Sequence, residues 1–241
     1  YTTNITSLEV MTISSVDYLF VALSTTTNYE YVSTATGSPV STTSTAVVND
    51  FKYFKVVNAA SPTMWGSDGD NTIRSTVNPL NGGTAWSGQT TIDAPSNVIT
   101  KLDTDSGSLY ITKEDIPYYL DSTGAVKNDM APILATLPRS TDNVKSSNFW
   151  LGNWYLPWVY SLLEEDAGTL TWRSPNDFST QLADFAGQVF AVAGDDHYLF
   201  VIVDNGTKIE VLACRLEVID GTTRWVIHHI NETSLTGCEA C

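Results

Sequence analysis

The amino-acid sequence predicts an all-β fold of the β-sandwich, jelly-roll or barrel-like kind, with an antiparallel meander at the C-terminal end and one or two short helices. Two observations predict it. Short apolar runs recur between clusters of Gly, Pro, Asn and Ser, which is the spacing typical of sandwiches and barrels. The apolar run Tyr198–Val203 precedes Asp204-Asn205-Gly206, and Asn-Gly between such runs is a strong hairpin signal.

The C-terminal meander has three predicted strands. Tyr198–Val203 is continuously apolar, which predicts a strand buried on both faces. Lys208–Ile219 resumes the strand pattern, and its apolar residues change face near Ala213, which indicates a bulge. A turn at Asp220-Gly221 leads into the third strand, Thr222–Ile230.

The N-terminal part repeats some of this pattern at an offset of 180 residues. The identities are Tyr18–Val21 with Tyr198–Val201, Thr27 with Thr207, and Glu30 with Glu210. Convergence is one explanation, because any two buried hairpins draw on the same residue types. A true duplication is the other, and it favours a β-propeller-like repeat as the alternative fold.

The remaining elements follow from the same signals. Further strands are predicted at Leu8–Ile13, Tyr29–Ser33, Phe51–Val57, Ser108–Thr112, Leu170–Arg173 and Gln188–Ala193. A helix is predicted from Ser174, its cap, to Gly187, and a second short one over Trp158–Glu165. Residues 61–97 have the composition of a long loop, which could instead contain weak strands. We expect a single β-rich domain over residues 1–241, with a possible subdivision near 61–97.

Charge and composition restrict the partners and the location. Twelve basic and 27 acidic residues give a formal charge of −15, so a phosphate backbone would be repelled and nucleic-acid binding is not expected. No apolar run approaches the roughly 20 residues of a membrane-spanning helix. The acidic, hydroxyl-rich composition favours an extracellular, virion-surface or cell-surface location. The chain starts at Tyr1 without a Met or a signal-peptide pattern, so we expect a processed chain or a fragment.

Three cysteines and three sequons bear on the same question. We expect one disulfide that joins Cys214 to Cys238 or Cys241 and leaves one thiol over. A zinc site with His228 or His229 and a C-x-x-C redox site are weaker alternatives. N-x-T sequons at Asn4, Asn205 and Asn231 permit glycosylation, although the Ser and Thr content alone predicts about three by chance.

Four tryptophans are the candidate binding residues. Trp65 and Trp86 lie in the loop-like segment, where exposed aromatic rings favour a contact surface for a sugar or a protein. Trp154 and Trp158 belong to an aromatic cluster for which packing in a core is the favoured alternative.

The acidic clusters carry weaker signals. Asp68–Asn71 resembles the start of a calcium loop but lacks the spacing and the terminal Glu of an EF-hand, so a tight turn is the alternative. Glu164–Asp166 is read as a solvated helix end, because glycosidase carboxylates normally lie on separate elements. Asp195–His197 lacks an accompanying nucleophile motif. No catalytic residue, metal or cofactor is therefore expected.

The sequence accordingly predicts a non-enzymatic surface domain for attachment, receptor binding or glycan binding. Its expected partners are a glycan, a protein receptor or copies of itself. A self-assembling capsid, spike or filament subunit is the first alternative, joined through strand addition at Leu8–Ile13 or through the spare cysteine. A carbohydrate-active enzyme with acids that no motif identifies is the second.

Overall fold

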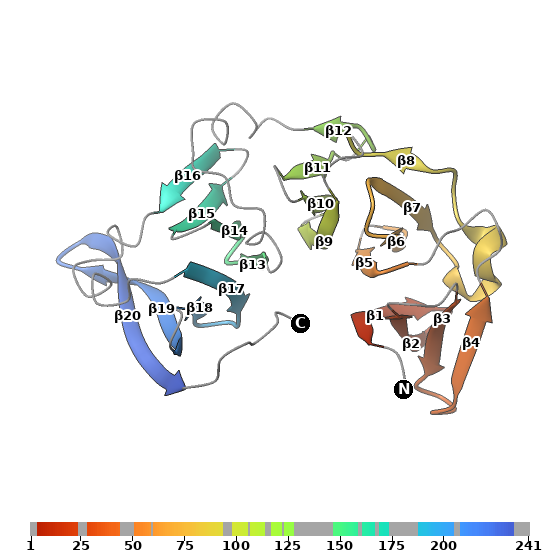
Figure 1. Cartoon of the computed structure of the whole chain (residues 1–241), viewed down its shortest axis with the longest axis horizontal. Helices are drawn as coiled ribbons and strands as arrows, with labels where there is room; N and C mark the ends of the chain where they lie inside the picture. Colours follow the sequence, from red (N-terminus) through yellow and green to blue (C-terminus); the bar gives the residue numbers. More distant parts are fainter. Residues whose placement is uncertain are drawn as a thin grey trace. The chain divides into compact units, whose positions relative to one another are not determined.

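The computed structural model describes most of the chain as antiparallel β-structure (Figure 1). The described residues are 4–23, 28–43, 51–58, 60–93, 98–105, 107–113, 117–121, 123–127, 147–158, 161–166, 169–173, 188–204 and 208–233. Within them the strands form five sheets of four strands each. Every sheet is a meander in which each strand pairs with the next one in the chain, as in a propeller blade.

The chain divides into two compact units. The first contains residues 1–113 and 118–127, and the second contains residues 114–117 and 128–241. Three sheets belong to the first unit and two to the second. Residues 61–97, where a subdivision was possible, therefore lie inside the first unit.

The first unit contains β1 to β12 and one short 3-10 helix, η1. The first sheet consists of β1 (Ile5–Ile13), β2 (Val16–Leu23), β3 (Asn28–Ser33) and β4 (Pro39–Thr43). The second consists of β5 (Tyr53–Val57), β6 (Thr63–Ser67), β7 (Thr72–Thr76) and β8 (Thr90–Thr91), with η1 (Pro79–Ala85) before β8. The third consists of β9 (Ile99–Asp105), β10 (Ser108–Lys113), β11 (Tyr118–Leu120) and β12 (Val126–Lys127). The first strands are neighbours, because β5 packs beside both β1 and β9.

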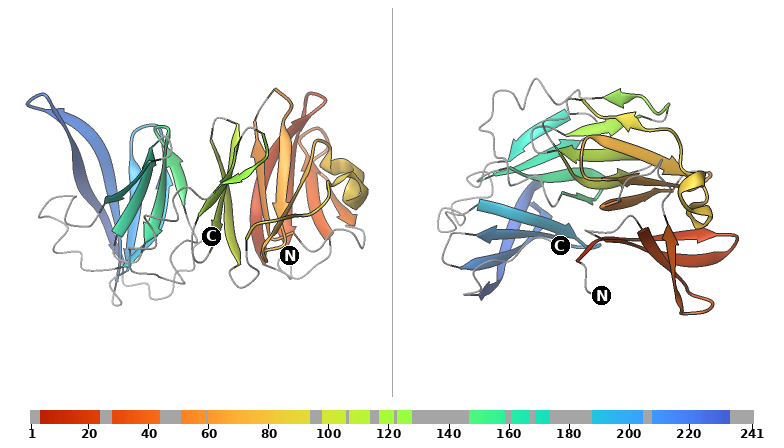
Figure 2. Two further views of the ribbon diagram at one scale, coloured as in Figure 1. Left: turned by 90° about the horizontal axis from the view of Figure 1, so that it is seen from above. Right: turned by 45° about the vertical axis from the view of Figure 1, so that its right-hand side comes forward.

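The second unit contains the last two sheets, drawn in teal and blue in Figure 2. One consists of β13 (Asn148–Trp150), β14 (Asn153–Trp158), β15 (Ser161–Asp166) and β16 (Thr169–Arg173). The other consists of β17 (Gln188–Gly194), β18 (Leu199–Asp204), β19 (Ile209–Ile219) and β20 (Thr222–Thr233). The first strand β17 packs beside β13 and β14.

A core of aromatic rings joins the first two sheets. Tyr29 on β3 meets Phe54 edge-on with ring centroids 5.5 Å apart, and Phe51 lies 4.3 Å from Trp86. The Trp86 Nε1 donates to the Tyr29 hydroxyl at 3.3 Å, and that hydroxyl donates to the Pro79 carbonyl at 2.5 Å. Burial raises the pKa of Tyr29 to about 12, so the hydroxyl stays protonated and holds η1 against the core.

The second unit has its own core. It lies between β13–β15 and β17–β20 and is formed by Trp150, Tyr155, Leu162, Val189, Val192, Leu199, Val201, Val203, Leu212 and Cys214. Trp225 and Ile227 of β20 pack against it. Along β18, the buried residues Leu199, Val201 and Val203 alternate with partly exposed ones, so the strand is buried on one face only. The expectation that Tyr198–Val203 is buried on both faces is thus wrong.

Most of the β-structure predicted from the sequence is present in the structure. The all-β class and all strands predicted outside 61–97 are confirmed, and the sheets match the propeller-like alternative rather than a two-sheet sandwich. The bulge expected near Ala213 lies at Val211 and Leu212. Residues 61–97 contain β6, β7, η1 and β8, which confirms the alternative of short strands. The helix predicted from Ser174 lies outside the described residues.

The helix predicted over Trp158–Glu165 is wrong. Trp158 ends β14, and β15 begins at Ser161. Pro157, which immediately precedes the segment predicted as a helix, pairs with Leu162 in the ladder between β14 and β15. It lies beyond the part of β14 that pairs with β13, so its missing N–H removes no ladder bond there.

Among the described turns, three hairpins turn through two residues with positive φ. These turns are Ser14-Ser15, Leu151-Gly152 and Asp220-Gly221. Two positive φ values match the right-handed strand twist, but side chains other than Gly occupy this region at a cost of about 1 kcal/mol or more. The Ser14-Ser15 turn is therefore the most strained of the three.

Relief of this strain is measurable. We expect Ser15→Gly to raise the free energy of unfolding by about 1 kcal/mol, because Ser15 has φ 66° and glycine adopts that value freely. Gly221→Ser, at φ 75° in the equivalent turn position, is the matched reverse change and is expected to lower it by a similar amount. Urea unfolding of both variants checks this, and changes of the same sign would contradict the turn assignment.

Candidate functional site

Trp65 on β6 is the predicted binding residue that the structure leaves partly exposed. It stands in a row across the second sheet, with Lys55 of β5 on one side and Ser75 of β7 on the other. The alternate residues Phe54, Val56 and Met64 point to the opposite face and form the core. Within the described part of the chain, the Trp65 ring has no recorded ring contact and its indole N–H no recorded hydrogen bond. We call Lys55, Trp65, Ser75 and the adjoining Ser87 the Trp65 row.

Hydroxyl groups border one end of the row. Two hydrogen bonds join Ser75 and Ser87. The Ser75 N–H donates to Ser87 Oγ at 2.9 Å, and the Ser87 N–H donates to the Ser75 carbonyl at 2.7 Å. Their two Oγ atoms are 3.2 Å apart. Val77, two residues beyond Ser75 in the chain, is exposed. A flat ring therefore lies beside fixed hydroxyls, an arrangement suited to a ligand with both apolar and hydroxyl-bearing faces.

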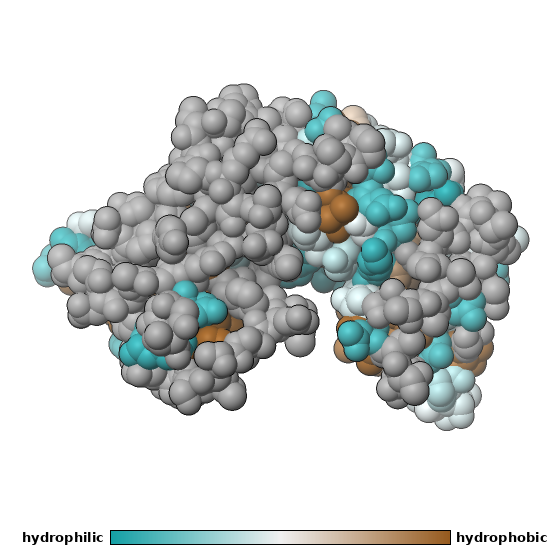
Figure 3. All heavy atoms as spheres, viewed as in Figure 1, coloured by the Kyte–Doolittle hydropathy of each residue, from teal (hydrophilic) through white to brown (hydrophobic). Residues whose placement is uncertain are grey.

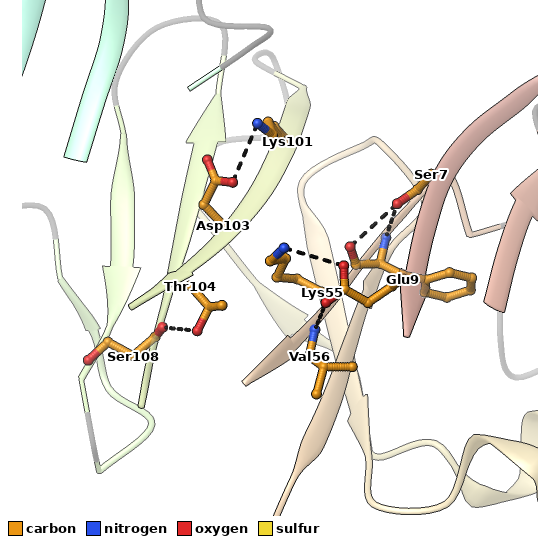
Figure 4. Close-up of polar contacts among 9 residues, drawn as sticks. Ser7, Glu9, Lys55, Val56, Lys101, Asp103, Thr104 and Ser108 are labelled. Atoms are coloured by element: carbon orange, nitrogen blue, oxygen red, sulfur yellow. Dashed lines mark hydrogen bonds and ion pairs between the residues drawn. The ribbon is translucent and has the colours of Figure 1, made fainter. Parts of the chain in front are cut away.

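The other end of the row is fixed by strand β1 (Figure 4). Glu9 accepts from the Lys55 ammonium at 3.3 Å through Oε2 and from the Val56 N–H at 3.0 Å through Oε1. The Phe54 N–H donates to Ser7 Oγ at 3.1 Å. These contacts satisfy N–H groups on the free edge of β5, which would otherwise be open to strand addition. They also pair the positive charge at Lys55 with a carboxylate.

A second charged pair lies on β9. The Lys101 ammonium is 3.4 Å from the Asp103 carboxylate, and Thr104 Oγ1 donates to the Ser108 carbonyl at 3.0 Å (Figure 4). The neighbouring strands β1, β5 and β9 thus all carry charged side chains. Figure 3 shows both polar and apolar residues on the described surface in this view.

The other three candidate tryptophans are placed differently. Trp86 is 6% exposed and packs in the first core, and Trp154 is 0% exposed. Neither presents a ring face on which a ligand could stack, so the contact-surface role expected of Trp86 is not what the structure shows. The side chain of Trp158 lies outside the described residues.

The acidic clusters are used within the fold. Asp68 Oδ1 accepts from the Asp70 N–H at 2.9 Å and its Oδ2 from Thr72 Oγ1 at 3.1 Å, as in a tight Asx turn. Glu164 is on strand β15 and 5% exposed, which corrects the expectation of a solvated helix end. Among the described residues, no three His, Cys, Asp or Glu side chains come close enough to share a metal ion.

Asp195 shapes the turn between β17 and β18. Its Oδ1 accepts from the backbone N–H groups of His197 and Tyr198, each at 2.7 Å. These two hydrogen bonds hold the pKa of Asp195 below its usual value, so its charge is retained to lower pH. The carboxylate thus organises the turn through backbone groups.

The predicted disulfide and glycosylation sites fall largely outside the described part. Cys214 is 1% exposed in the second core, and burial raises the pKa of its thiol to about 12. The Cys214 thiol is free in this structure, so the expected bond from Cys214 to the tail is not formed here, and Cys238 and Cys241 lie outside the described residues. Asn4 is exposed, Asn205 is not described, and the backbone of Asn231 belongs to β20. No described helix is long and apolar enough to cross a membrane.

Comparison with known proteins identifies the fold. No family model and no curated protein matches the chain. The extracellular domain of a putative hybrid two-component system from B. thetaiotaomicron matches with TM-score 0.55 and 13% identity, over 92% of this chain and 27% of that one. Hsv2 of Kluyveromyces lactis matches with TM-score 0.54 and 10% identity, over 96% of this chain and 66% of that one.

A third match is the AfRom2 CNH domain, with TM-score 0.51 and 9% identity, over 92% of this chain and 80% of that one. The chain therefore spans only about a quarter of the first structure and less than two thirds of the second. At these identities the likeness shows the fold alone. The chain has an all-β fold of the kind found in β-propeller and CNH-like domains.

Proposed function

We propose that this chain is a non-enzymatic binding module on the outside of a cell or particle and that it binds a neutral glycan at the Trp65 row. The observation that carries the proposal is that the Trp65 ring is partly exposed and, among the described residues, contacts no other aromatic ring. A Trp ring held on a sheet offers a rigid apolar platform with a polar N–H at its edge. The apolar face of a sugar ring fits such a platform.

The groups beside the ring support a sugar rather than an ionic ligand. Ser75 Oγ donates to Ser87 Oγ and can still accept a hydrogen bond from a sugar hydroxyl, whereas Ser87 Oγ donates to the Gly88 carbonyl and holds Ser75 in place. The Lys55 charge is already paired with Glu9 at 3.3 Å, so the row offers little net attraction for a carboxylate, sulfate or phosphate. The formal charge of −15 opposes anionic ligands further. We therefore expect uncharged glycans to be preferred.

The outside location has two supports. The acidic, hydroxyl-rich composition is common in extracellular β proteins. One of the similar structures is itself an extracellular domain.

Removal of the ring tests the site. We expect Trp65→Ala to weaken glycan binding by at least about tenfold, because the stacking surface is lost, and Trp65→Phe to retain most of it. The measurement is a glycan array followed by calorimetry on the best neutral ligand. Lys127→Gln on β12, outside the Trp65 row, is the control for the loss of one positive charge and is expected to leave the affinity unchanged. Equal binding by wild type and Trp65→Ala, or no glycan bound by the wild type, would contradict the proposal.

A further inference from the structure

The hairpin of β19 and β20 extends past the rest of its sheet (Figures 1 and 2). Strand β18 pairs with β19 only as far as Cys214, whose partner is Leu199. The ladder between β19 and β20 continues to Ile219, which pairs with Thr222. Residues 215–226 therefore form a two-stranded projection, which we call the arm.

One face of the arm is apolar and continuous with the core. Trp225 packs against Trp150 with ring centroids 5.5 Å apart, and its ladder partner on β19 is Leu216. Two residues further out, Val218 is 73% exposed. The stripe from Trp225 through Leu216 to Val218 thus runs out of the core into solvent, where surface of this kind marks an interaction site.

The arm also has an open edge. Within the described residues, no strand pairs with the side of residues 215–219 that continues the β18 side of β19. The base of this edge is fixed, because Arg215 donates to the Tyr198 hydroxyl at 3.4 Å and lies 5.8 Å from the centre of that ring. Unpaired N–H and C=O groups beside exposed apolar side chains are a template for strand addition.

Charge decides which strand fits this edge. The exposed acids Asp195 and Asp196 lie in the turn at the base of the arm, where the Tyr198 N–H donates to Asp195 Oδ1 at 2.7 Å and the Tyr198 hydroxyl accepts from Arg215. On the arm itself Glu217 forms an ion pair with Arg215. The charges of Asp220 and Arg224 cancel, so the arm has no net charge. The edge is therefore acidic at its base, which favours a basic partner. A second copy of this chain, with its formal charge of −15, is disfavoured.

We propose that the arm is a docking site for an extended basic segment of another protein, which adds as a strand to the edge of β19 at residues 215–219. Alternate apolar residues of that segment pack on Leu216 and Val218. Its Lys or Arg residues lie near Asp195 and Asp196. This site is in the second unit, so it is independent of glycan binding at Trp65.

A model peptide tests the proposal. The probe is a fluorescent seven-residue peptide that alternates lysine and valine, and its binding to the whole chain is followed by anisotropy. A block peptide of the same composition, with all lysines before all valines, controls for charge alone. We expect the alternating peptide to bind at least about tenfold more tightly, because only alternation places its valines on one face.

Variants of the chain complete the test. Val218→Ser is expected to remove most of this preference, whereas Val40→Ser, at an exposed valine of β4 that is 45% exposed, is expected to leave it unchanged. Both positions are solvent-facing, so both variants should fold. Equal affinity for the two peptides, or no effect of Val218→Ser, would overturn the proposal. So would self-association in sedimentation that Val218→Ser abolishes, because the occupant would then be a second copy.

Discussion

Replacement of Trp86 by alanine is expected to lower the free energy of unfolding by about 3–5 kcal/mol, the range for removing a buried aromatic side chain. Trp86 is 6% exposed, lies 4.3 Å from Phe51, and donates to the Tyr29 hydroxyl. Its loss would leave a cavity between the first two sheets and would remove the donor to Tyr29. Urea unfolding followed by far-UV circular dichroism measures the change.

Trp65→Ala is the matched control for this prediction. The Trp65 ring is partly exposed and contacts no other aromatic ring among the described residues, so its removal is expected to cost less than the removal of Trp86, by about 1 kcal/mol or more. The two tryptophans are 21 positions apart in the chain, yet Trp86 is buried in the core and Trp65 is partly exposed. Equal losses of stability in the two variants would contradict the assignment of Trp65 to a binding surface.

Replacement of Glu164 by alanine is expected to lower the free energy of unfolding by about 2–3 kcal/mol. The buried carboxylate accepts from the Tyr155 hydroxyl at 3.0 Å and from Asn153 Nδ2 at 2.7 Å. Tyr155 is 1% exposed, so its hydroxyl would lose a partner that water cannot readily replace. Thermal and urea unfolding of Glu164→Ala measure the loss.

A double-mutant cycle separates the loss of the hydrogen bond between Glu164 and Tyr155 from a general packing effect. The variant Tyr155→Phe has no hydroxyl that could lose its hydrogen-bond acceptor. In this background, we expect the loss of unfolding free energy caused by Glu164→Ala to be smaller by about 1 kcal/mol or more. A carboxylate kept for catalysis behaves differently, because its removal often leaves stability unchanged or raises it. Stability equal to or above that of the wild type in Glu164→Ala would therefore favour the enzyme alternative.

Much of the β-structure is predictable because its strands are long and apolar. The run at Tyr198–Val203 predicts β18, and Asp220-Gly221 predicts the turn between β19 and β20. The repeat at Tyr18–Val21 also has a structural counterpart, since β2 and β18 are both the second strands of their meanders. The two hairpins differ in register, because Glu30 pairs with Val21 whereas Glu210 pairs with Val203. This comparison therefore leaves both duplication and convergence open.

The sequence allows weak strands within residues 61–97 but does not place them, and the reason is physical. β6 and β7 have five residues each, and Met64, Trp65 and Ile73 are their only large apolar side chains, so neither strand shows a regular apolar alternation. Gly66, in the middle of β6, reads as a strand breaker. In the structure the Phe51 ring fills the space beside it, and a Cβ at Gly66 would lie 2.6 Å from Phe51 Cδ1. The contact that requires this glycine comes from the preceding loop, which local patterns do not reveal.

The candidate site is only partly predictable. Composition singles out Trp65 and Trp86 alike, because both lie among Gly, Asn and Ser residues. The structure distinguishes the two tryptophans by strand pairing and by η1. Pairing with Lys55 places Trp65 on the face of the sheet opposite the core, and Trp86, at the end of η1, points into the core. The partners Glu9 and Ser75 have no signal in the sequence, since each is brought to the row by pairing between separate strands.

The most direct test of glycan binding at Trp65 is fluorine NMR of protein labelled with 5-fluorotryptophan. The chain has seven tryptophans, and Trp65→Phe assigns the resonance of interest by its loss. On titration with the best neutral glycan from the array, we predict that the Trp65 resonance shifts and saturates while the buried Trp86 and Trp154 resonances stay nearly constant. A glycan that binds while the Trp65 resonance does not move would contradict the proposed site.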